Sequence, residues 1–155
     1  MSISEQWSPA LPVVQLRIAR PTDRLEEVVA FYRDGIGLSV IDSFQNHAGY
    51  SGVMLGLPGT RYHLEFTHHE AGSDCPAPSK DNLLVFYLSE RKEMECVVEK
   101  LHAMGYPSVA PENPYWSAAH SVTIADPDGW RIVFMLLSDP HLTSTRDVTA
   151  TSFWE

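Results

Sequence analysis

The sequence predicts an α+β fold built from two successive βαβββ modules. Each half of the chain begins with an apolar strand that is followed by an amphipathic helix, and three short extended segments follow each helix. The last segments of the two halves also match, since YHLEF at 62–66 and WRIVF at 130–134 share the order aromatic, basic, aliphatic, variable, Phe. A duplicated module explains these agreements.

The first module is predicted at residues 12–69. Its strands are expected at residues 13–19, 38–42, 50–55 and 61–67. Its helix carries apolar residues at i, i+3, i+4 and i+7, namely Leu25, Val28, Val29 and Tyr32. Asp23, with Glu26 three residues later, predicts a capping box at the start of this helix. The helix is expected to end near Gly35 or Gly37.

The second module is predicted at residues 81–137 and repeats this plan. Its strands are expected at residues 82–88, 106–110, 120–125 and 130–137. The helix shows the same apolar spacing at Met94, Val97, Val98 and Leu101. Ser89 is the expected N-cap and Gly105 the expected end. The polar segment 70–80 joins the modules within a single domain, 1–155, and the Ser- and Thr-rich residues 138–155 are expected to form a C-terminal tail.

Composition and motifs exclude several classes of function. With 11 Lys and Arg against 20 Asp and Glu, the net charge of −9 argues against nucleic acid and anionic membrane as partners. No apolar run is long enough to span a membrane and no signal segment is present, so a cytoplasmic location is expected. Cys75 and Cys96 form no CxxC pair. The motifs GxSxG, GxxxxGK[ST], GxGxxG and HExxH are absent.

Two motifs resemble those of the vicinal oxygen chelate superfamily, which contains glyoxalase I, extradiol dioxygenases, fosfomycin-resistance transferases and bleomycin-resistance proteins. They are FYRDGIGL at 31–38 and DPDG at 126–129, and the resemblance covers about residues 12–137. It implies curved mixed sheets that enclose a cleft, with the helices outside. It also implies a homodimer, for which unpaired module edges give a physical motive. Both motifs shape the backbone, so they bear on fold rather than chemistry.

The resemblance implies a divalent metal held by four ligands on the first and last strands of both modules. Glu65 matches one ligand position and Gln15 is a candidate for a second, whereas Leu83 and Val133 occupy the other two. No complete metal site is therefore expected, and no cofactor is certain. A metal held by Gln15 and Glu65 alone is left open. An alternative cluster of Glu65 with His63, His68 and His69 is disfavoured, because it requires a bulge in the strand.

Strand alternation selects the residues expected to face a ligand. Gln15 and Arg17 share one face of the first strand, and His63 and Glu65 share one face of the fourth. Val14, Leu16 and Ile18 then suit the helix-covered face. Arg17 and Glu65 form either a structural ion pair or a ligand site, with Arg17 binding an anion and Glu65 accepting an amine or acting as a general base. His63 is a second candidate for proton transfer. In the second module, the candidates are Tyr87, Tyr115, Trp116 and His120.

The residues and the resemblance leave three functions open. The leading hypothesis is a protein that binds a small organic molecule in the cleft between the modules, without the full metal site and by analogy with bleomycin-resistance proteins. The alternative is a divalent-metal-dependent lyase, isomerase or dioxygenase of the same superfamily. The third is an interaction module whose cleft is filled by side chains. The acidic net charge favours neutral or cationic ligands, whereas Arg17 favours anions.

Overall fold

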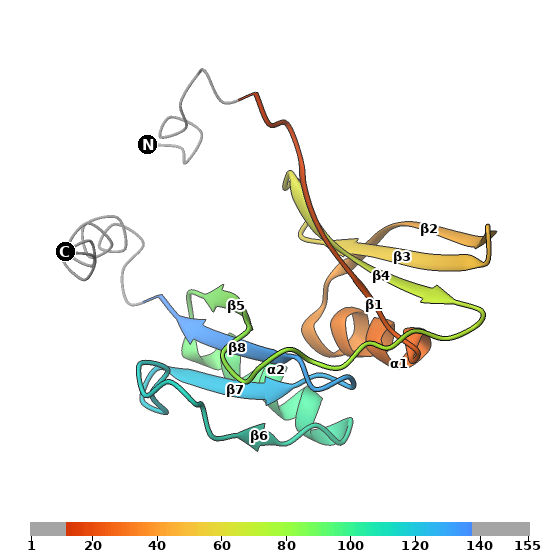
Figure 1. Cartoon of the computed structure of the whole chain (residues 1–155). Coiled ribbons are helices and arrows are strands. Elements are labelled where there is room, and N and C mark those ends of the chain that lie inside the picture. The colour runs from red at the N-terminus through yellow and green to blue at the C-terminus, as the bar shows by residue number, and fades with distance from the viewer. Residues whose placement is uncertain (1–11, 138–155) are drawn as a thin grey trace, which may run out of the picture. The chain divides into compact units, whose positions relative to one another are not determined.

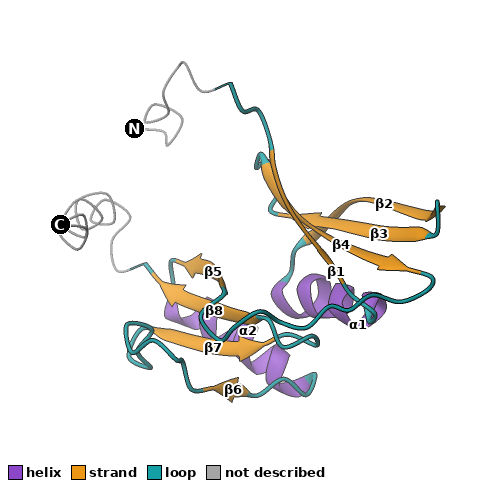
Figure 2. Cartoon of the chain, in the orientation of Figure 1, coloured by secondary structure: helices purple, strands orange, loops and turns teal. Residues whose placement is uncertain are grey.

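The computed structural model describes residues 12–137, which fall into two compact units that divide between Cys75 and Pro76. Each unit contains a four-stranded mixed sheet and a helical segment (Figure 1, Figure 2). The predicted C-terminal tail lies outside the described residues. Among the described residues, no helix has the length and apolarity needed to cross a membrane.

The first unit runs β1 (Leu16–Pro21), α1 (Leu25–Ala30), the π-helical segment η2 (Phe31–Ile36), β2 (Ser39–His47), β3 (Tyr50–Gly56) and β4 (Tyr62–His69). Its strands lie in the order β1-β4-β3-β2. β1 pairs with β4 in parallel, while the other pairs are antiparallel. The parallel pair requires a crossover, and α1 with η2 lies within it.

The second unit repeats this topology. It runs β5 (Leu83–Leu88), α2 (Arg91–Ala103), β6 (Ser108–Val109), β7 (Ser121–Ala125) and β8 (Arg131–Leu136). Its sheet has the order β5-β8-β7-β6, with β5 and β8 parallel. Two βαβββ modules are therefore confirmed. β6 is shorter than expected and β2 longer, but every predicted segment contains a strand.

The core of the first unit lies between its helical segment and β4. The rings of Tyr32 and Phe66 are 4.8 Å apart between centroids, and both side chains are buried. Leu16 and Ile18 lie on this helix side of β1, since Ile18 pairs with Leu64 in the parallel register. They are nevertheless 56% and 49% exposed. The short α1 therefore does not cover the edge strand, contrary to the expectation from sequence.

The predicted helix ends are confirmed, whereas the predicted helix starts are wrong. Gly37 and Gly105 have φ of 97° and 98°, the left-handed conformation that ends a helix at low cost in glycine. Arg24 and Glu90 precede α1 and α2, and neither makes a side-chain capping hydrogen bond. Ser89, the predicted N-cap of α2, lies one residue before the observed N-cap Glu90. Asp23, predicted to cap α1, hydrogen-bonds a residue outside the helix.

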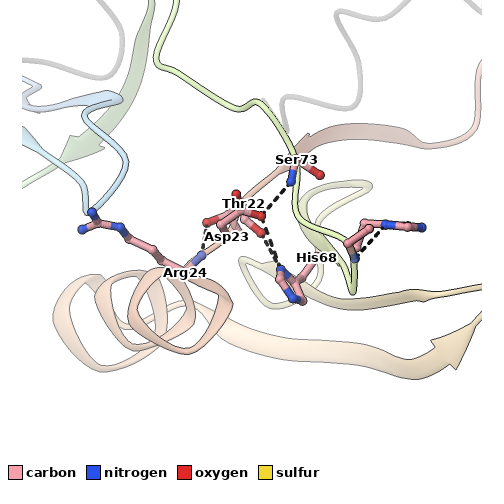
Figure 3. A network of polar contacts seen from close by, with 7 residues as sticks. Thr22, Asp23, Arg24, His68 and Ser73 are labelled. Carbon is pink, nitrogen blue, oxygen red and sulfur yellow. Dashed lines mark hydrogen bonds and ion pairs between the residues drawn. The ribbon is translucent and has the colours of Figure 1, made fainter.

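Asp23 joins three segments of the first unit instead of capping α1. Its Oδ1 accepts the backbone N–H of Ser73 at 2.9 Å and lies 3.7 Å from Nδ1 of His68 (Figure 3). The same His68 nitrogen is 3.2 Å from the carbonyl oxygen of Thr22. Asp23 thereby holds the first residues after β4 against the end of β1.

Truncating Phe66 should destabilise the protein. We expect Phe66→Ala to cost about 3–5 kcal/mol of unfolding free energy, because it removes a buried ring that packs on Tyr32. Tyr62→Ala on the same strand is the control. Tyr62 is 52% exposed, so its substitution should cost about 0.5 kcal/mol of unfolding free energy. Urea unfolding measures both, and equal losses would contradict this account of the core.

Asp23→Ala should release the segment that follows β4. Its loss removes the acceptor of the Ser73 N–H, so that amide should exchange with solvent about tenfold faster. Asp42→Ala is the matched control, because Asp42 accepts only the neighbouring N–H of Ser43 among the described residues. Amide exchange measured by NMR distinguishes the two, and an unchanged Ser73 rate would show that Asp23 does not hold the segment.

Candidate functional site

Four polar side chains meet on the face of the first sheet that lies away from α1. Arg17 on β1 pairs in register with His63 on β4, and Glu65 follows two residues later on the same face. Gln15 lies just before β1. The structure thus brings together Gln15, Arg17, His63 and Glu65, all four of the ligand-facing residues predicted in the first module.

Arg17 is the centre of this cluster. Its Nε donates to Nε2 of His63 at 2.9 Å, and its Nη1 donates to Oε2 of Glu65 at 3.1 Å. The side chain of Arg17 is 46% exposed, whereas that of Glu65 is only 10% exposed. A molecule that approaches this face therefore meets the guanidinium before it meets the carboxylate.

The hydrogen bond from Arg17 fixes the protonation pattern of His63. A guanidinium can only donate, so Nε2 of His63 must accept and the neutral ring carries its proton on Nδ1. That Nδ1 lies 3.3 Å from the amide of Gln15. The amide atom at that distance is the nitrogen Nε2, and a half-turn about the terminal bond, which exchanges the amide nitrogen and oxygen, would let the oxygen accept the Nδ1–H.

Apolar side chains that the sequence reading missed border this cluster. Met54 on β3 pairs with Glu65 and shares its face. A Cβ at Gly52 would lie 2.5 Å from the ring of Phe44, and a Cβ at Gly56 would lie 2.8 Å from Ile41. The two glycines therefore let large side chains of β2 lie against β3. Two glycines inside one strand are the sequence signal that would have indicated this close approach.

The register of the parallel strands identifies the counterpart of each site residue in the second unit. His63 and Arg131 correspond through the matching YHLEF and WRIVF segments, and their parallel partners are Arg17 and Leu83. The counterpart of Leu83 is therefore Arg17, two residues after Gln15. Glu65 corresponds in the same way to Val133, which is fully buried.

The candidates in the second unit occupy separate elements. Tyr87 on β5 is 56% exposed and shares a face with Leu83. Tyr115 and Trp116 stack edge to face, with ring centroids 4.9 Å apart, in the loop before β7. His120 immediately precedes β7 and is exposed. A buried residue of β7, Thr123, was missed by the sequence reading, and its Oγ1 has no hydrogen-bond partner among the described residues.

The side chains present do not fit the divalent metal that the fold family implies. Across residues 12–137, no group of three or more His, Cys, Asp or Glu side chains is placed to hold one ion. Arg17 already donates to Nε2 of His63 and to one carboxylate oxygen of Glu65, Oε2. His69 instead stacks on Tyr50, with ring centroids 4.5 Å apart.

Comparison with known proteins identifies relatives over most of the chain. The YycE-like N-terminal domain matches residues 16–67 and the YycE-like C-terminal domain matches residues 81–136. The protein YycE of Bacillus subtilis strain 168 is 55% identical over 121 residues, which cover 78% of this chain and 86% of YycE.

Solved structures show the same fold. A crystal structure of Bacillus subtilis YycE, a protein of unknown function considered a candidate glyoxalase/fosfomycin-resistance protein, aligns with a TM-score of 0.75 at 55% identity, over 79% of this chain and 88% of that chain. Trypanothione-dependent glyoxalase I of Leishmania major aligns with a TM-score of 0.68 at 17% identity, over 90% of this chain and 97% of that chain. TnmS3, an antibiotic-binding protein from Streptomyces sp. CB03234, aligns with a TM-score of 0.57 at 20% identity, over 83% of this chain and 98% of that chain.

The proton position on His63 is directly testable. In wild-type protein at mildly alkaline pH, long-range proton–nitrogen NMR spectra should show His63 with its proton on Nδ1, because Arg17 donates to Nε2. Arg17→Met removes the donor and should allow the proton to move to Nε2. The exposed His120 is the control, and its spectrum should be the same in both proteins. A wild-type His63 protonated on Nε2 would contradict the hydrogen bond.

Proposed function

The chain belongs to the YycE-like family of the vicinal oxygen chelate superfamily, and from this relationship we propose that it binds a small organic anion at Arg17 without a divalent metal. The face that carries Arg17 is the candidate binding surface, and the anionic group of the ligand pairs with the guanidinium. An antibiotic-binding protein with the same fold, TnmS3, supports the idea that this scaffold serves ligand binding.

The observation that carries the proposal is the exposure of Arg17. Two of its donors are held by His63 and Glu65, while Nη2 makes no hydrogen bond to any residue the structure describes. A guanidinium held flat by two partners is preorganised, so little side-chain entropy is lost when a further acceptor binds. A carboxylate or phosphonate oxygen is the acceptor that matches this donor.

Apolar side chains on the same face of the sheet suit the organic part of such a ligand. Met54 lies opposite Glu65, and Ile41 and Phe44 of β2 lie over Gly56 and Gly52 further across the same face, so a planar or aliphatic group that extends from Arg17 across the sheet can bury area against them. Glu65 reduces the local positive charge, so charge alone does not recruit the ligand. The site is therefore suited to a ligand that combines an anionic group with an apolar body.

Benzoate and its uncharged analogue benzamide test the proposal. Benzoate should bind weakly to the wild-type protein and shift the amide NMR signals around Arg17 and Met54, whereas benzamide should cause smaller shifts. Arg17→Met should weaken benzoate binding by about tenfold or more, because it removes a charge-assisted hydrogen bond. NMR titration gives the dissociation constants.

Two controls define the result. Arg61→Met removes another exposed arginine of the same unit and should leave benzoate binding unchanged. Phenylphosphonate tests whether a second anionic head group binds in the same place. Equal binding of benzoate and benzamide, or benzoate binding that survives Arg17→Met, would contradict the proposal.

A further inference from the structure

The Arg17 guanidinium lies between two acceptors that are also common metal ligands. Nε2 of His63 and Oε2 of Glu65 both face it, at 2.9 Å and 3.1 Å from its nitrogens. The two acceptor residues are 7% and 8% exposed, so the cation is held by a largely buried pair. An imidazole nitrogen and a carboxylate oxygen ligate zinc, nickel and cobalt in proteins.

His63 also has a polar neighbour at its second ring nitrogen. A histidine that binds a metal through one nitrogen generally donates the N–H of the other nitrogen to an oxygen, which fixes the ring orientation and the tautomer. Here Nε2 faces the cation, and Nδ1 lies 3.3 Å from the amide nitrogen of Gln15, whose oxygen a half-turn of the amide would bring to the same place. The ring therefore already directs Nε2 at the position of the cation, and the Arg17 donor requires the tautomer with its proton on Nδ1.

Removal of the guanidinium would leave both acceptors without their cation. A buried carboxylate that loses an ionic partner is costly, and a divalent ion with bound waters would restore the missing charge. While Arg17 is present, its positive charge repels a divalent ion and its donors occupy the same lone pairs. The arginine accordingly keeps the site closed to metal.

We propose that the Arg17 guanidinium is a built-in replacement for a divalent cation, and that His63 and Glu65 are a latent metal-ligating pair with Gln15 as the outer partner of His63. This inference goes beyond the proposed function, because it concerns the ion that the site accepts rather than the organic ligand. It identifies Arg17 as the residue that determines which kind of cation occupies this face.

Cobalt binding to arginine variants tests the inference. Arg17→Ala should bind one Co²⁺ per chain, measured by elemental analysis after gel filtration and by the visible absorption bands of the bound ion. It should also unfold at a higher temperature when Co²⁺ is added, because binding stabilises the folded state. The wild-type protein and Arg61→Ala, which loses an exposed arginine, should show neither effect.

Second substitutions identify the ligands. In the Arg17→Ala background, Glu65→Gln and His63→Gln should each weaken Co²⁺ binding by more than about tenfold, and Gln15→Ala should weaken it by about tenfold. Arg17→Gln keeps much of the stem and provides the same measurement if Arg17→Ala folds poorly. A folded Arg17 variant that binds no Co²⁺, or whose Co²⁺ binding survives Glu65→Gln, would overturn the inference.

The result is independent of the benzoate titration. If benzoate binds to the wild-type protein and Co²⁺ does not bind to the Arg17 variants, only the proposal that Arg17 replaces a cation is contradicted. If Co²⁺ binds to Arg17→Ala and benzoate does not bind to the wild type, only the proposed function is contradicted. Tight Co²⁺ binding by the wild type through His63 and Glu65 would overturn the cation replacement, since Arg17 would then not close the site.

Discussion

The parallel pairing of β1 with β4 is the constraint on which the first unit depends. Two parallel neighbours need a crossover connection, and the helical segment with β2 and β3 lies within that connection. The register of the pair places Arg17 opposite His63 and buries Phe66 against Tyr32 on the other face. A shift of one residue would exchange these faces and bring the charged cluster into the core.

The charged cluster is stable because its members satisfy one another. Glu65 and His63 are buried, and a buried carboxylate or imidazole is tolerated only when hydrogen-bonded. Arg17 supplies both hydrogen bonds from β1, the edge strand, so its side chain remains about half exposed. Structural ion pair and ligand-binding group are thus compatible roles for this arginine.

The two units use the same topology with different chemistry. At equivalent positions, the first unit has Arg17 and Glu65 and the second has Leu83 and Val133. The backbone hydrogen bonds that define the sheet do not depend on these side chains, so apolar residues stand in the second module where the first has Arg17 and Glu65, although Arg131 is the counterpart of His63. Two modules with the same backbone topology therefore carry different side-chain chemistry at equivalent positions, and a shared fold does not imply a shared site.

The sequence by itself determined the two βαβββ modules, the glycines that end the helices and the four side chains of the polar face, because apolar periodicity and strand alternation are local properties of the chain. The predicted cap of α1 was wrong because Asp23 hydrogen-bonds Ser73, fifty residues away, in preference to its own helix. Only the tertiary structure decided that Arg17 is the counterpart of Leu83 and that Phe44 lies over Gly52. Register between distant strands arises from long-range pairing, which no local pattern contains.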